Sequence, residues 1–339
     1  MIELPRPYLL FLGDITEPGY AKTAYGLRDW AGDACVGEFA LPGGLSIDLT
    51  PMRPAAAKAA GAQSMVIGVA NPGGVIAAHW IPPLVEALEA GLHLIGGMHA
   101  KLNAIPELVA AAKAADRKLI DIRVPPANIP VASGAKRAGK RLLTVGTDCA
   151  LGKKYTALAL SRAFTARGVN ADFRATGQTG ILIAGAGMPM DAVVADFEAG
   201  AAELLSPANA PDHWDVIEGQ GSLFHPAYAG VSLGLLHGSQ PDAIVLCHDP
   251  SRTAVLGYPD YPLPDLQEAI DLTLQLGART NPAIRCAGVS LNTSRLSAAD
   301  AAKEITRVRK RLKLPAADPL RGGPAFDELV EACLSEGQA

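Results

Sequence analysis

The residues that decide the fold are 141–154, RLLTVGTDCALGKK, an apolar run that leads into a glycine-bounded loop and then two lysines. The run at 141–145 predicts a buried strand, and residues 153–167 have the spacing of an amphipathic helix that ends at Gly168. Backbone N–H groups in a loop of this kind, at a helix N-terminus, bind anions. The stretch therefore predicts a strand–loop–helix unit that binds phosphate. The alternative is an ordinary connection that carries a surface lysine.

The loop departs in two places from the phosphate-loop pattern G-x-x-x-x-G-K-[ST]. Gly152 and Lys153 fit, but Gly146 comes one position early and leaves Thr147 at the usual glycine position. Lys154 stands where Ser or Thr would ligate Mg²⁺, and a second ammonium group there disfavours a metal. Because phosphoryl transfer depends on Mg²⁺, we expect phosphates that are held and not transferred. The residues expected at the cofactor are Gly146, Thr147, Asp148, Cys149, Ala150, Leu151, Gly152, Lys153, Lys154 and Tyr155.

The rest of the chain predicts a two-domain α/β protein. Its length of 339 residues suggests two domains, since one domain takes about 100–200 residues. Buried-type strands at 8–12 and 64–70 alternate with helical patterns at 82–90 and 105–115, which favours a parallel sheet. The proline-rich residues 125–130 are the best linker. We therefore expect domains at 1–130 and 131–339.

Composition limits the partners and the compartment. The chain has 30 basic and 34 acidic residues, which argues against nucleic acid as a partner. No signal peptide and no apolar run of about 18 residues is present, so no membrane partner is expected. Five scattered cysteines without a C-x-x-C pair argue against structural zinc and favour the cytoplasm. The Gly/Ala-rich, aromatic-poor composition suggests a homo-oligomer.

A second candidate motif, DVIEGQGS at residues 215–222, places an acid at the end of an apolar strand. Open α/β sheets bind ligands at the carboxyl ends of their strands, so Glu218 and Gln220 are expected to face the loop. His225 follows shortly and could act as a general base near neutral pH. The alternatives are that Glu218 only caps a turn and that His225 is structural.

Three further segments supply candidates. Gln178, in RATGQTG at 174–180, offers a neutral donor beside the phosphate loop and is expected at the cofactor. Arg252, in HDPSR at 248–252, could hold a carboxylate in a bidentate fork or could be a solvated loop residue. Lys22 and Thr23 are substrate-side candidates near the start of the chain, where Lys22 could equally be a surface lysine. No G-x-G-x-x-G follows the first strand, so NAD binding is poorly supported.

The GTDxxxGK loop followed by VIEGxG is similar to the phosphate-loop fold of the dethiobiotin synthetase type, except that Lys154 replaces a threonine. Residues 8–312 resemble more closely a bacterial two-domain family long known as a domain of unknown function. The resemblance rests on Lys22-Thr23-Ala24, 146–153, 174–180, 218–222 and Ser290-Leu291-Asn292. It implies a Rossmann-like N-terminal domain, a P-loop NTPase-like C-terminal domain and mostly parallel sheets.

Members of that family are associated with N-acetylation of D-amino acids, D-glutamate in particular, with acetyl-CoA as donor and a product that enters D-glutamate catabolism. The resemblance thus implies that Lys153 and the loop hold the phosphates of coenzyme A, and that Lys154 contacts a phosphate or the oxyanion. Glu218 or His225 would be the base. Substrate contacts would come from Lys22, Thr23, Gln220 and Arg252. Two alternatives stay open: an ATP- and Mg²⁺-dependent ligase or kinase, with Asp148 and Glu218 at the metal, and a non-catalytic nucleotide sensor.

Overall fold

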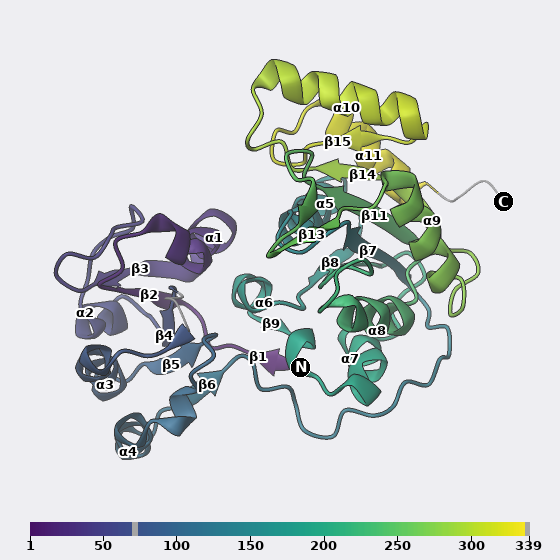
Figure 1. Cartoon of the computed structure of the whole chain (residues 1–339). Helices are drawn as coiled ribbons and strands as arrows, with labels where there is room; N and C mark the ends of the chain where they lie inside the picture. Colours follow the sequence, from purple (N-terminus) through teal and green to yellow (C-terminus); the bar gives the residue numbers. More distant parts are fainter. Residues whose placement is uncertain (70–73, 336–339) are drawn as a thin grey trace. The chain divides into compact units, whose positions relative to one another are not determined.

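The computed structural model describes residues 1–69 and 74–335 and divides the chain into two compact units (Figure 1). One comprises Met1–Pro126 with Gln178–Ala192, and the other comprises Ala127–Gly177 with Val193–Ala339. Each unit is built around its own parallel sheet. The expected α/β class with mostly parallel sheets is confirmed.

The first unit contains a five-stranded parallel sheet in the order β3-β2-β4-β5-β6. Its strand β2, which lies between β3 and β4, is buried along its whole length, as its continuous apolar sequence YLLFLG predicts. The strands are β2 (Tyr8–Gly13), β3 (Cys35–Ala40), β4 (Ser64–Ile67), β5 (His93–Gly96) and β6 (Leu119–Asp121). The helices connecting them are α1 (Lys22–Ala31), α2 (Pro54–Ala59), α3 (Ile81–Glu89) and α4 (Pro106–Ala115).

A segment from the middle of the chain completes this unit. Helix α6 (Gln178–Ala184) packs against α1, and the hydroxyl of Tyr8 donates to the carbonyl of Leu182 at 3.3 Å. Strand β9 (Ala186–Gly187) pairs antiparallel with β1 (Ile2–Glu3) at the start of the chain. A single division of the chain at residue 130 does not include residues 178–192 in the first unit. That division stays a prediction.

The second unit contains a six-stranded parallel sheet in the order β15-β14-β11-β7-β10-β8. The strands are β7 (Lys140–Gly146), β8 (Ala171–Arg174), β10 (Trp214–Ile217), β11 (Ala243–His248), β14 (Arg285–Leu291) and β15 (Ala316–Ala317). Its helices are α5 (Lys153–Ala166), α7 (Glu198–Leu205), α8 (Ala229–Ser239), α9 (Leu266–Gly277), α10 (Ala298–Leu312) and α11 (Pro324–Leu334). A short antiparallel hairpin joins β12 (Ala254–Val255) to β13 (Tyr258–Pro262).

Two apolar clusters hold the helices against this sheet. One joins β7 and β10 to α5 and α11 and contains Phe164 edge-on against Trp214, with ring centroids 5.7 Å apart. The other joins β11 and β14 to α9 and α10. Short 3-10 helices of the described residues lie at Pro18–Tyr20, Gly32–Ala34, Ala78–Trp80, Leu102–Ala104, Met190–Ala192 and Ala195–Phe197. No helix of the described residues has both the length and the apolar character needed to cross a membrane.

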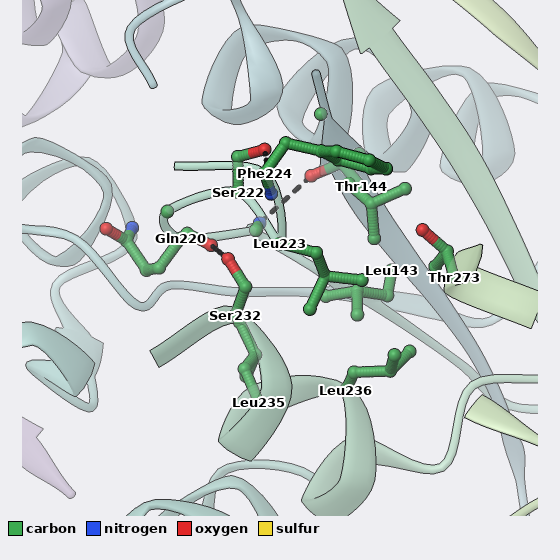
Figure 2. Close-up of a pocket in the computed structure, with 14 residues that line it drawn as sticks. Leu143, Thr144, Gln220, Ser222, Leu223, Phe224, Ser232, Leu235, Leu236 and Thr273 are labelled. Carbon is green, nitrogen blue, oxygen red and sulfur yellow. Dashed lines mark hydrogen bonds between the residues drawn. The ribbon is translucent and has the colours of Figure 1, made fainter. Parts of the chain in front are cut away.

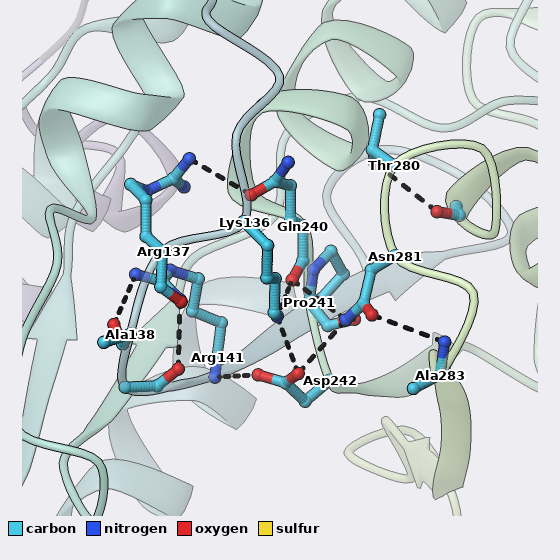
Figure 3. A network of polar contacts seen from close by, with 12 residues as sticks. Lys136, Arg137, Ala138, Arg141, Gln240, Pro241, Asp242, Thr280, Asn281 and Ala283 are labelled. Carbon is cyan, nitrogen blue, oxygen red and sulfur yellow. Dashed lines mark hydrogen bonds and ion pairs between the residues drawn. The ribbon is translucent and has the colours of Figure 1, made fainter.

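The amino-terminal edge of the second sheet is fixed by a polar network (Figure 3). Arg141 is fully buried, and its guanidinium donates to the carbonyls of Arg137, Ala138 and Gly139 at 3.0–3.1 Å. Asp242 accepts from the backbone N–H of Arg141 at 2.8 Å and from Lys136 at 2.7 Å. Residues 136–141, which follow the expected linker, are therefore bonded to the sheet, and the carboxyl edge on the opposite side is left for ligands.

Candidate functional site

The phosphate loop lies at the centre of the carboxyl edge, between the end of β7 and the start of α5. Ala150 and Gly152 have left-handed backbones, with φ of 51° and 119°. In the described part of the chain the backbone N–H groups of Ala150, Leu151, Gly152 and Lys153 donate no hydrogen bond. Consecutive unpaired N–H groups at a helix N-terminus form an anion nest. The geometry therefore supports the predicted phosphate site.

The two loop lysines add positive charge at the same place. Lys153 is buried, and its ammonium group donates to the carbonyl of Asp148 at 2.7 Å. The ammonium of Lys154 lies 4.4 Å from the ring centroid of Tyr155. Burial lowers the pKa of both lysines, and Glu218 opposes this shift. A bound phosphate would offset the cost of burying these charges.

Glu218 follows β10, the strand next to β7, and is 3% exposed. Its Oε2 accepts from the backbone N–H of Thr176 at 2.9 Å and of Gly177 at 3.0 Å, so it does cap a turn. Its Oε1 accepts no hydrogen bond from the described residues, which leaves it able to take a proton. Burial raises the pKa of Glu218, while the two N–H groups and both loop lysines lower it to a smaller extent. A raised carboxyl pKa suits a general base near neutral pH.

Gln220 supports this turn through its side chain and its backbone. The side-chain amide of Gln220 donates to Thr176 Oγ1 at 2.9 Å, and its backbone carbonyl accepts from Ser232 Oγ at 2.7 Å. The cavity behind it, lined also by Thr144 and Ser222, has a volume of about 20 Å³ (Figure 2). That volume holds roughly one water molecule. The prediction that Gln220 binds substrate stays a prediction.

Gly219 shows why the turn after β10 needs a glycine. A Cβ at this position would lie 1.7 Å from the carbonyl oxygen of Thr144 on the neighbouring strand. The Gly219 N–H also donates to Thr144 Oγ1 at 3.0 Å (Figure 2). This close approach aligns the end of β10 with the phosphate loop.

His225 has a fixed orientation. Its Nδ1 accepts from the backbone N–H groups of Ala227 at 3.1 Å and Tyr228 at 3.2 Å, and its ring stacks on Tyr228 with centroids 4.5 Å apart. The proton of the neutral ring is therefore on Nε2, so the ring is a hydrogen-bond donor there. This favours Glu218 as the base. The base role of His225 stays a prediction.

One group near the loop has metal-ligand chemistry. A carboxylate oxygen of Asp148, the thiol of Cys149 and a ring nitrogen of His225 lie within 4.8 Å of one another. The Asp148 carboxylate already accepts from the N–H of Cys149 at 2.6 Å, the N–H of Leu256 at 2.9 Å and the guanidinium of Arg252 at 3.0 Å. A cation would compete with Arg252 for the same oxygens, so this group fits a metal poorly. Binding without a metal stays a prediction.

Arg252 contacts the phosphate loop itself. Its Nη1 donates to Asp148 Oδ2 at 3.0 Å and to the carbonyl of Cys149 at 2.8 Å, and its Nη2 donates to the carbonyl of Ala150 at 2.7 Å. Its Nε is 3.4 Å from Asp249 Oδ2. These bonds do not test the predicted contact between Arg252 and a substrate carboxylate. They show that the guanidinium binds the phosphate loop.

The other predicted residues belong to the first unit. Lys22 and Thr23 begin α1, and Thr23 Oγ1 lies 3.3 Å from Thr179 Oγ1. Gln178 begins α6, and with its amide oriented to satisfy its neighbours it donates to the carbonyl of Gly97 and accepts from Arg123. The chain crosses between the units directly before Gln178. Contacts of these residues with substrate or cofactor stay predictions.

The first unit also holds a polar group at the end of β2, where residues 13–17 are substrate-side candidates in the sequence. Asp14 follows β2 and accepts from Trp80 Nε1 at 2.8 Å, and its other oxygen lies 3.0 Å from His79 Nε2. Trp80 lowers the pKa of Asp14. The signal available in the sequence was an acid directly after a buried strand, at residues 13 and 14.

Two family models match the chain. The P-loop domain described as "Domain of unknown function (DUF1611_C)" covers residues 130–330, and the Rossmann-like domain "DUF1611_N" covers residues 38–125. The chain belongs to the DUF1611 family. The resemblance inferred from the sequence motifs, including the order of the two domains, is thus confirmed.

Relatives of this DUF1611 chain carry one activity in their names. A protein of Tritonibacter scottomollicae is 53% identical over 98% of this chain and 99% of its own length, and is named D-glutamate N-acetyltransferase. A Pseudoalteromonas protein with the same name is 46% identical over 95% of this chain and 97% of its own. The crystal structure of a DUF1611 family protein from Anabaena variabilis is 33% identical, with a TM-score of 0.84, and covers 97% of this chain and 99% of that one.

Proposed function

We propose that this chain is a D-glutamate N-acetyltransferase, which moves the acetyl group of acetyl-CoA to the amino nitrogen of D-glutamate. The two relatives with that name, which match this chain over nearly its full length, support the proposal. The observation that carries the chemistry is the phosphate loop, where four backbone N–H groups that have no partner among the described residues adjoin Lys153 and Lys154. Such a loop can hold the phosphates of coenzyme A while no phosphate bond is broken.

The phosphates are assigned to the second unit. Lys153 and the N–H groups of residues 150–153 would bind the pyrophosphate or the 3′-phosphate, and Lys154 a phosphate or the developing oxyanion. Lys154 replaces the usual Mg²⁺ ligand. Acyl transfer from a thioester breaks a C–S bond, so the reaction does not need the metal that phosphoryl transfer uses.

The transfer needs a base. The neutral amino nitrogen attacks the thioester carbonyl carbon, the C–N bond forms, and the C–S bond breaks to release coenzyme A as thiolate. The proton lost by nitrogen goes to Glu218 Oε1, the carboxylate oxygen without a hydrogen bond in the described residues. The released thiolate takes up a proton from solvent, and Glu218 gives its proton to solvent, which restores the carboxylate. Lys22 and Thr23 stay predicted substrate contacts, while the side chains of Gln220 and Arg252 already bond to protein groups.

The composition supports the wider assignment. A charge balance of 30 basic to 34 acidic residues suits small-molecule substrates better than nucleic acid. Five cysteines without disulfides in the described residues suit a reducing compartment, so we propose a cytoplasmic enzyme. A homo-oligomer is expected from composition.

The test is a thiol-release assay with acetyl-CoA and a panel of D- and L-amino acids, each with and without EDTA. We expect coenzyme A release with D-glutamate that EDTA does not reduce, and N-acetyl-D-glutamate as product. Release with L-amino acids only would contradict the assigned substrate. No release with any amine, together with D-glutamate-independent hydrolysis of ATP in Mg²⁺, would favour the ATP-dependent alternative, and tight nucleotide binding without turnover would favour the sensor.

A further inference from the structure

Arg252 and Asp148 form a buried pair that connects two loops at the carboxyl edge. Asp148 is fully buried, and the side chain of Arg252 is 14% exposed. The pair is joined at 3.0 Å, and Asp148 Oδ2 also accepts from the N–H of Leu256 at 2.9 Å. The loop after β11 is thereby bonded to the phosphate loop, across 104 residues of sequence.

The carbonyls that Arg252 binds determine where the loop N–H groups point. In a planar trans peptide the C=O and N–H are directed oppositely. The peptides of residues 149–151 are trans. Arg252 donates to the carbonyls of Cys149 and Ala150, so both of these carbonyls point toward its guanidinium group. The N–H groups of Ala150 and Leu151, which belong to those peptides, therefore point away from Arg252 and have no partner in the described residues.

The same bonds stabilise an uncommon backbone. Ala150 has a left-handed φ of 51°, which costs a residue with a Cβ free energy unless its surroundings hold it there. Arg252 binds the carbonyl on each side of the Ala150 Cα. Without these bonds the loop would relax toward conformations in which its N–H groups no longer converge.

We propose that Arg252, through its pair with Asp148, is the positioning residue that sets the phosphate loop in its anion-binding shape. This deepens the proposed function and rests on it only for the identity of the phosphates, those of coenzyme A. Arg252 then acts on acetyl-CoA through the loop and does not hold the carboxylates of the amino acid. Three of its five N–H groups already donate to Asp148, Cys149 and Ala150, and its Nε lies 3.4 Å from Asp249 Oδ2, so both sides of its fork already face protein acceptors.

The test compares Arg252→Lys with Arg285→Lys, a matched control. Arg285 also donates to backbone carbonyls, those of Ala332 and Cys333 at 2.9 Å and that of Ser335, but it lies at the start of β14, on the opposite edge of the sheet. Lysine keeps the charge but has one nitrogen in place of the planar fork, so it cannot reproduce the bonds that Arg252 makes from two separate terminal nitrogens. We expect R252K to raise the Kd for coenzyme A, measured calorimetrically without amino acid, by about tenfold or more.

Steady-state kinetics supplies the second readout. The KM for acetyl-CoA should rise with the Kd, the KM for D-glutamate should change by less than about twofold, and R285K should change neither. In R252A, guanidinium ion added to the buffer should partly restore coenzyme A binding. The double variant Asp148→Asn, R252K should lose less coenzyme A binding free energy than the two single variants lose in sum, because each single substitution already disrupts the same Arg252–Asp148 pair.

Several results would overturn the inference. One is an R252K enzyme with a raised KM for D-glutamate and an unchanged Kd for coenzyme A, which would restore the carboxylate role. Another is a loss of coenzyme A affinity no larger than that of R285K. If the wild type binds coenzyme A but releases none with D-glutamate, the proposed function fails while the Kd comparison still judges Arg252. If the wild type does not bind coenzyme A, both fail.

Discussion

Replacing Glu218 with glutamine removes one proton acceptor and leaves the surrounding bonds in place. The glutamine oxygen can accept from the N–H groups of Thr176 and Gly177, as Oε2 does at 2.9 and 3.0 Å. Alanine would instead leave two buried donors unsatisfied, at about 1–3 kcal/mol each in the free energy of unfolding. Glu218→Gln therefore separates the chemical role from the structural one, and Glu218→Ala combines them.

The expected loss follows from the role. A positioned general base contributes about 10²–10⁴-fold in rate, so kcat of E218Q should fall by that factor. This corresponds to about 3–5 kcal/mol of activation free energy, at about 1.36 kcal/mol per tenfold. The Kd for coenzyme A should change by much less, because Glu218 is assigned no contact with the phosphates. The assay is thiol release under saturating acetyl-CoA, with calorimetry for the Kd.

The pH profile gives an independent readout. Burial raises the pKa of Glu218, and below that pKa the carboxyl is protonated and cannot accept a proton. The wild-type kcat/KM should thus fall as the pH decreases through the raised pKa, and E218Q should lack this acidic limb. Burial lowers the pKa of Lys153 and Lys154, so affinity for acetyl-CoA should fall as the pH increases through those values. An E218Q enzyme with kcat within about threefold of wild type, or an unchanged acidic limb, would refute the assignment.

Three further predictions concern the loop and its supports. Lys153→Ala should raise the KM for acetyl-CoA at least about tenfold with a smaller change in kcat, whereas Lys303→Ala, at a side chain 79% exposed, should leave both unchanged; equal effects of the two would count against the loop as the phosphate site. Gly219→Ala should lower the free energy of unfolding by about 3 kcal/mol or more, because its Cβ would meet the Thr144 carbonyl oxygen at 1.7 Å. The control is Gly230→Ala in α8, where a Cβ would have nothing within 4 Å, so this variant should not be destabilised. Thermal denaturation compares the two variants. His225→Asn keeps an acceptor for the N–H groups of Ala227 and Tyr228, so its kcat should stay within about tenfold of wild type, and a loss as large as that of E218Q would restore His225 as the base.

The phosphate loop and the end of β10 could be recognised in sequence because their chemistry is local. A strand, a glycine-bounded loop and a lysine at a helix start are adjacent residues, and each signals its conformation independently of the rest of the fold. Adjacent parallel strands end at one edge, so Glu218 was also expected near the loop, and β10 does pair with β7. The family resemblance added the domain order and the activity, which residue patterns alone left open between transferase, ligase and sensor.

The partners of Arg252 could not be predicted in this way. The residue follows a strand end, and its pattern was equally compatible with a substrate carboxylate or with solvent. Its actual bonds join residues separated by 102–104 positions, and they exist because β11 and β7 are neighbours in the sheet. The orientation of the His225 ring likewise depends on a turn, since two N–H groups beside it bind Nδ1.

The sequence by itself therefore determined the fold class and predicted the phosphate loop and two candidate bases, Glu218 and His225, since these follow from spacing within a few residues and from strand ends. Tertiary structure alone decided that residues 178–192 complete the first unit, and which atoms Arg252 binds. The physical reason is that hydrogen bonds require distances near 3 Å and a defined direction. Those conditions are met only after the sheet brings distant segments together, and no local pattern in the chain encodes them.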